Sequence, residues 1–121
     1  MAQKAQSTPL DGDFPDIITS EDELTSTASV DLFNGPVSVT TIEIDGAASE
    51  EFVKIYDALT VTPASDVPDI VFPVPANQFR TLTIIGGLSF TTGFSVRAVT
   101  SGADENTTDP STPAPGFFVG K

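Results

Sequence analysis

Apolar residues recur at every second position through the stretch from Glu51 to Thr100. This is the period of β-strands that bury one face and expose the other. The positions that carry the alternation are Val53 and Ile55; Ile70, Phe72 and Val74; Leu82 and Ile84; Leu88 and Phe90; and Phe94, Val96 and Ala98. The pattern therefore predicts a series of strands around one shared core.

The stretch from Ser29 to Ile44 predicts two further strands, ASVDLF and PVSVTTIEI. They are joined at Asn34-Gly35, a dipeptide typical of tight hairpin turns, so we expect them to pair with each other. The apolar positions of the second strand change phase, from Val37 and Val39 to Ile42 and Ile44. One extra residue produces such a change, which predicts a β-bulge near Thr40 and Thr41.

The run PDIVFPVPA contains Pro68, Pro73 and Pro75. Proline cannot donate to a strand ladder, so this run is predicted to be an edge strand. Gly86-Gly87 is predicted to be a turn, and the segment after it reads either as one strand bent at Gly93 or as two strands joined by a tight turn.

Lys54 lies between Phe52 and Tyr56 on the face of its strand opposite Val53 and Ile55. One interpretation is a second, partly buried face from which Lys54 reaches solvent or meets an acid on the next strand. The other is a partner-contact patch anchored by Tyr56. Arg80 and Arg97 are expected on outward faces, paired with carboxylates.

The two ends of the chain differ from this central region in composition. Residues 1–28 are rich in Ser, Thr, Pro and acids and contain only scattered apolar anchors, which is too little to fold alone. We expect an extended N-terminal arm over 1–28, with at most one helical turn at Ser20–Glu23, a β-sandwich core over 29–100 and a Pro/Thr-rich tail over 101–121. The tail ends in Phe117-Phe118, which should dock either on a neighbouring subunit or back on its own sheet.

Composition excludes several functions. The 121 residues contain no Cys and no His, so thiolate sites and the commonest general base are absent. A net charge of −12 opposes binding to nucleic acid and to anionic membranes, and no apolar run reaches the roughly 20 residues of a membrane span. The N-terminus lacks the apolar segment of a signal peptide. We expect a soluble, non-enzymatic protein without a cofactor.

Acidic residues cluster in Asp11–Asp16 and in Ala103–Asp109. Neither cluster has the spacing of an EF-hand, so no metal site is predicted. Asp57, Glu43 and Asp69 could form a carboxylate pair for hydrolysis, but nothing in the sequence distinguishes them from other acids on strand faces. No catalytic residue is assigned.

Two segments carry a family resemblance. They are KIYDALTVTPASDVPDIVFPVPAN, from Lys54 to Asn77, and GGLSFTTGFSVRAVTSGADENTT, from Gly86 to Thr108. Together they resemble small virion proteins of tailed bacteriophages over about half of the chain. The sequence departs from that pattern at Pro63-Ala64-Ser65, where the family often has a glycine-containing loop, and both ends of the chain lie outside the similar region.

The spacing of about seven or eight short strands predicts a single antiparallel β-sandwich, jelly-roll or immunoglobulin-like. The resemblance implies that this sandwich is a virion component made in the host cytoplasm. The expected function is that of a capsid decoration or cement protein, which binds the outer surface of the major capsid protein and bridges its subunits with the N-terminal arm over 1–28. We expect a trimer or dimer, because the core is small and the lattice symmetric. The alternative is a head-fibre or tail-associated module that recognises a host glycan. The expected partner-contact residues are Leu10, Phe14, Ile17, Ile18, Tyr56, Phe117 and Phe118.

Overall fold

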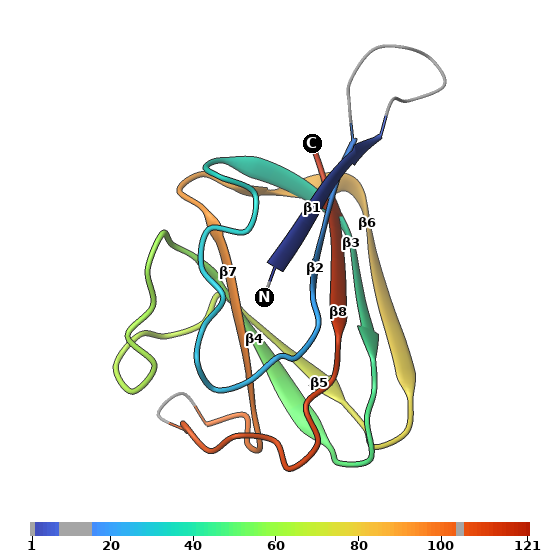
Figure 1. The fold of residues 1–121 in the computed structure, drawn as a ribbon. Coiled ribbons are helices and arrows are strands. Elements are labelled where there is room, and N and C mark those ends of the chain that lie inside the picture. Colours follow the sequence, from blue (N-terminus) through green and yellow to red (C-terminus); the bar gives the residue numbers. More distant parts are fainter. Residues whose placement is uncertain (1, 8–15, 104–105) are drawn as a thin grey trace.

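The computed structural model describes residues 2–7, 16–103 and 106–121, and the described chain consists of strands and loops (Figure 1). The strands are β1 (Ala2–Ser7), β2 (Asp16–Glu21), β3 (Val37–Asp45), β4 (Glu51–Asp57), β5 (Ile70–Val74), β6 (Phe79–Phe90), β7 (Phe94–Val99) and β8 (Gly116–Gly120). This part of the chain contains no helix with the length and hydrophobicity of a membrane span.

The strands form two antiparallel sheets that pack face to face. The larger sheet has the order β1-β2-β8-β3-β6 and the smaller has the order β5-β4-β7. Apolar side chains from both inner faces fill the space between them, as the alternation in the sequence predicts. Phe94 lies at the centre, with ring centroids 5.0 Å from Phe90, 5.1 Å from Phe118 and 5.5 Å from Phe33. The predicted fold class, an antiparallel β-sandwich, is confirmed.

The segments expected as an arm and a tail contribute strands to the larger sheet. β2 lies between β1 and β8, and β8 lies between β2 and β3, so both are interior strands. The fold therefore extends well beyond residues 29–100. Composition suggested otherwise because each segment has few apolar residues, but an interior strand obtains its burial and its hydrogen bonds from the strands on either side. Of the two alternatives for the C-terminus, docking on its own sheet is the one observed.

The predicted bulge is confirmed. The register between β3 and its neighbours shifts between Val39 and Thr41, and residues 84–87 of β6 lie opposite Thr40 alone. Gly86 and Gly87 both have a φ of 82°, which glycine adopts without strain. They were expected to form a turn between strands, whereas β6 continues through them and the turn to β7 follows Phe90.

Two local predictions are wrong. The segment before Asn34-Gly35 pairs with β7 through a bridge between Ser29 and Val96, while β3 pairs with β6 and β8. Asn34-Gly35 is a turn, but it connects the edge of the smaller sheet to the larger sheet, because Leu32 and Phe33 are buried in the core that the two sheets share. No helical turn forms at Ser20–Glu23, because Ser20 and Glu21 belong to β2. The predicted edge position of the proline-containing run is confirmed in β5.

Candidate functional site

The outer face of the smaller sheet holds two cations. Lys54 on β4 lies directly opposite Arg97 on β7, and neither side chain is exposed to solvent. The sequence placed both on outward faces, which is right for the strand alternation but wrong for solvent exposure. The difference arises because two loops, before β5 and after β7, cover this face.

Hydrogen bonds from the two cations hold these loops. The Arg97 guanidinium donates through Nε to the Tyr56 hydroxyl at 2.8 Å, through Nη1 to the Asn106 carbonyl at 2.8 Å and through Nη2 to the Pro63 carbonyl at 2.9 Å. Lys54 Nζ donates to the carbonyl of Ala103. Charge-assisted bonds of this kind are about twice as strong as neutral ones, so the buried face acts as an anchor for both loops.

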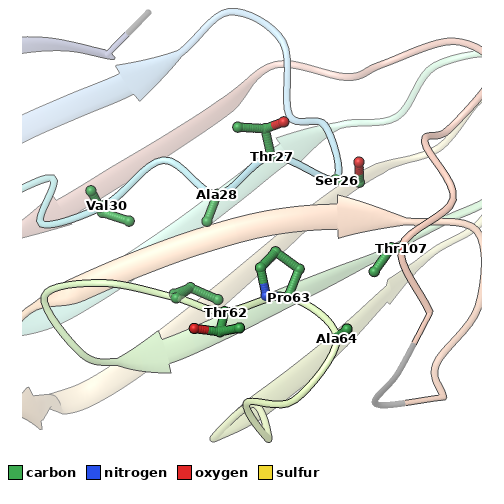
Figure 2. A pocket seen from close by; sticks show the side chains of 9 residues that line it. Ser26, Thr27, Ala28, Val30, Thr62, Pro63, Ala64 and Thr107 are labelled. Atoms are coloured by element: carbon green, nitrogen blue, oxygen red, sulfur yellow. The ribbon is translucent and has the colours of Figure 1, made fainter.

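A groove of about 490 Å³ opens beside this anchor (Figure 2). The segment around Ala28 forms one side, the loop at Pro63 forms the other, and Thr107 lies at one end. The lining residues are Ser26, Thr27, Ala28, Val30, Val61, Thr62, Pro63, Ala64 and Thr107, none of which is charged. Arg97 fixes both the Pro63 side and the residue before Thr107. The groove can accept hydrogen bonds and apolar contacts from a neutral ligand, but its side chains supply no acid, base or activated nucleophile.

A recess of about 280 Å³ lies where β5 and β6 approach each other, and Asp57 and Asp69 are among its lining residues. Asp57 accepts hydrogen bonds from the N–H groups of Thr91, Thr92 and Gly93 at 3.1, 2.8 and 3.2 Å, and these bonds, that from Thr92 first, lower its pKa. Asp69 Oδ2 accepts from the N–H of Asp57 at 2.6 Å. Both carboxylates therefore serve as turn caps. Glu43, the third acid considered for a carboxylate pair, lies on the outer face of the other sheet.

Glu51 is a buried acid that the sequence did not single out. It begins β4 on the core-facing side, opposite Val74, with no exposed surface, and neither carboxylate oxygen has a hydrogen-bond partner in the described chain. Desolvation raises its pKa from 4.5 to about 7. The strand alternation could have found it, because Glu51 has the same parity as Val53 and Ile55.

The acidic clusters give no metal centre in the described residues, where no group of three possible ligands converges. Residues 11–15, 104 and 105 lie outside the described chain. Asp109 accepts a hydrogen bond from the Ser26 N–H at 2.8 Å, and its bonds with Ser26 lower its pKa. It thus ties the second loop to the segment before β3.

The outer face of the larger sheet carries two of the expected contact residues. Ile18 is 39% exposed and Phe117 is 41% exposed. Across the strands, Ile18 lies beside Val119, which lies beside Thr41; one row along, Ser20, Phe117 and Glu43 are neighbours. This apolar patch, defined by Ile18, Phe117 and Val119, is bordered by the hydroxyl side chains of Ser20 and Thr41 and by Glu43.

The other expected contact residues are placed differently. Phe118 is fully buried, Tyr56 is 2% exposed with its hydroxyl bound to Arg97, and Ile17 packs against the core. These side chains offer little surface to a partner, since their strands point them inward or loops cover them. Leu10 and Phe14 lie outside the described residues.

The sequence reasoning also missed an acid-free stretch with several exposed apolar side chains. No acid occurs between Asp69 and Asp104, a run that includes all of β5, β6 and β7. Four large apolar side chains on β5 and β6 are exposed, namely Val71, Phe79, Ile85 and Leu88. The distribution of charge along the chain was the signal that could have revealed this stretch.

Comparison of the chain with protein-family models, with curated proteins and with solved structures finds no match in any of the three.

Proposed function

We propose that the protein is a non-enzymatic structural component of a tailed-phage virion, a decoration or cement protein that binds the outer surface of the assembled major capsid protein. The observation that carries the proposal is the apolar patch of Ile18, Phe117 and Val119 on an open sheet face of a protein with a net charge of −12. Exposed apolar surface with a polar rim is typical of a protein contact site.

The roles of the described charged groups agree with a structural function. Lys54 and Arg97 anchor loops, and Asp57 caps a turn. These contacts rigidify the sandwich, and a rigid domain loses little conformational entropy when it binds. The resemblance of residues 54–77 and 86–108 to small virion proteins supports the major capsid protein as the partner.

The mechanism is one of mass action. A protein that binds the assembled lattice and not its free subunits adds its binding free energy to the stability of the lattice. The patch lies on β2 and β8, two interior strands of the larger sheet, so its shape is fixed by the fold. This replaces the bridging arm expected from the sequence with a preformed surface.

Binding to particles tests the proposal. Particles stripped of the protein should rebind the full chain, while Ile18→Lys and Phe117→Lys should weaken binding at least tenfold, because each buries a charge in an apolar contact. Val67→Lys is the matched control, since Val67 is 67% exposed on a loop away from the patch. If both patch variants bind like the original protein, the patch is not the contact.

A host-recognition module is the second candidate, and the uncharged, hydroxyl-containing groove at Pro63 favours it. A glycan could accept and donate hydrogen bonds with such a lining. Copy number separates the two candidates: a decoration protein should approach the abundance of the major capsid protein in purified virions, whereas a fibre or tail module should be far less abundant.

A further inference from the structure

The outer edge of β6 is the longest open strand edge in the described chain. β6 lies at the end of the larger sheet and pairs with β3 alone, as Figure 1 shows. Its regular part is Phe79–Thr83, five residues that follow the turn after β5 and precede the bulge at 84–87. An open edge of this kind offers unpaired backbone groups to another strand.

The hydrogen bonds at the start of β6 show which groups point outward. The Gly46 N–H donates to the Gln78 carbonyl at 2.9 Å, whereas the Asp45 N–H donates to Pro115, on the β8 side, at 3.2 Å. In an antiparallel pair, bonded and non-bonded positions alternate, so Arg80 and Leu82 bond to β3. The N–H and C=O groups of Phe79, Thr81 and Thr83 consequently point away from the sheet.

The open edges of β5 and β6 differ in how well they are protected against the addition of a further strand. β5 contains Pro73, and Pro68 and Pro75 flank it, so its edge cannot accept a regular partner strand. The segment Phe79–Thr83 contains no proline, no glycine and no acid. Phe79 is also 58% exposed beside this edge. Proline, one of the features that prevent strand addition, therefore protects the edge of β5 and is missing from Phe79–Thr83. The bulge of β6 begins only after Thr83, and Arg80 is the one charged residue of the segment.

We infer that this edge binds a second copy of the chain, with β6 pairing antiparallel to β6 of that copy about a two-fold axis through Thr81. The pairing joins two five-stranded sheets into one. This inference does not depend on a role in the virion.

A second copy fits this edge because the edge is complementary to itself. With Thr81 opposite Thr81 of the second copy, Phe79 of each copy lies opposite Thr83 of the other, and all outward backbone groups of the five residues are paired. Thr–Thr and aromatic–β-branched pairs are favourable cross-strand pairs. No other antiparallel self-pairing uses the whole regular segment.

Charge opposes a second copy less at this edge than elsewhere on the surface. Each copy carries −12, so two copies repel over most of their surfaces. The nearest acid on the exposed face is Glu43, which lies beside Thr81 on β3. In the pairing it would be separated from Glu43 of the second copy by three strand spacings, about 14 Å, which exceeds the Debye length of about 8 Å at physiological salt.

Sedimentation equilibrium of the full chain tests the inference. We expect a particle of twice 12.6 kDa. Thr81→Lys and Thr81→Glu each place like charges face to face at the two-fold axis and should weaken dimerisation about 100-fold. Thr60→Lys and Thr60→Glu, on an exposed loop, should leave it unchanged. An equimolar mixture of the Thr81→Lys and Thr81→Glu chains should restore dimers, which a folding defect would not allow. A monomer at concentrations up to about 1 mM, or dimers insensitive to both Thr81 substitutions, would overturn the inference.

Cysteine cross-linking tests the register, since the natural chain has no cysteine. Thr81→Cys should form a disulfide-linked dimer on mild oxidation, because hydrogen-bonded antiparallel pairs have Cα atoms about 5.5 Å apart, within disulfide range. Phe79→Cys and Thr83→Cys should cross-link readily only when mixed. Rapid cross-linking of Phe79→Cys alone, or none at Thr81→Cys, would contradict the register.

Discussion

Lys54 and Arg97 are two cations that face each other across neighbouring strands, and both are fully buried. Like charges directly opposite in a sheet are unfavourable, so other contacts must offset their proximity. The structure provides carbonyl oxygens of Ala103, Asn106 and Pro63 from the two loops that cover this face. The cations therefore stay buried only while the two loops cover them, and the loops are held in place by hydrogen bonds from the cations.

Replacing Arg97 should therefore loosen both loops. Arg97→Leu leaves the Tyr56 hydroxyl and two carbonyl groups without their donor, and we expect the free energy of unfolding in urea to fall by about 3 kcal/mol. Arg97→Lys should also destabilise, because an ammonium group cannot reproduce the three-way fork.

Arg80→Leu is the control for Arg97. Arg80 is partly exposed and lies 5.3 Å from the centre of the Phe72 ring, so its loss should cost less than about 1 kcal/mol. Equal effects at positions 80 and 97 would show that Arg97 does not anchor the loops.

Glu51 should make the protein less stable as the pH rises. Burial raises its pKa from 4.5 to about 7 in the folded protein, so the folded state binds a proton that the unfolded state releases between these values. The contribution to stability is fully present below pH 4.5 and is lost as the pH rises through 7. Glu51→Gln should be equally stable at pH 4 and more stable than the natural protein by up to about 3 kcal/mol at pH 8.

Urea unfolding at a series of pH values measures the Glu51 effect. Glu50→Gln is the matched control, since Glu50 is the exposed neighbour of Glu51. The idea fails if Glu51→Gln and the natural protein lose stability in parallel between pH 5 and 8.

The strands and the bulge were predictable because they depend on local alternation. Val39 and Ile42 differ in parity, and that difference alone requires an extra residue between them. The burial of Lys54 was not predictable, since it depends on loops whose paths are set by contacts distant in sequence. The sequence cannot show that Ala103 lies above a residue 49 positions earlier in the chain.

The ends of the chain illustrate the same limit. β2 and β8 lie in segments of mostly polar composition, and their place in the sheet depends on pairing with strands far away in sequence. An interior strand needs buried side chains on its core-facing side only, and Thr19 on β2 and Phe118 on β8 are such side chains. Among the expected contact residues, the exposed Ile18 and Phe117 could be told apart from the inward-facing Ile17 and Phe118 only once the core-facing side of each strand was known.

Asp57 should stabilise the turn before β7 in its ionised form. Its carboxylate accepts three backbone N–H bonds, which lower its pKa. The resulting stability is present above the ordinary pKa of aspartate, 3.8, and is lost as the pH falls below it through the lowered pKa. Asp57→Ala should cost about 1 kcal/mol at pH 7, a modest value because solvent screens the site.

Thermal unfolding at pH 7 and pH 3 measures the effect of Asp57→Ala, with Asp22→Ala as an exposed control. The difference between Asp57→Ala and the natural protein should shrink at pH 3. A constant difference would mean that the charge of Asp57 is not what stabilises the turn.

Phe117 and Phe118 are adjacent on β8, and the structure assigns them opposite roles. Phe118 has no exposed surface and packs 5.1 Å from the Phe94 ring, whereas Phe117 is 41% exposed on the outer face. Phe118→Ala creates a cavity in the core and should lower the free energy of unfolding by about 3–5 kcal/mol. Phe117→Ala should change it by less than about 1 kcal/mol, because little of its burial would be lost. Urea unfolding of the two variants is a direct comparison at neighbouring positions. A small effect at Phe118 would mean that the C-terminal segment is not an interior strand of this sheet, and the apolar patch that β8 presents would then have no fixed shape.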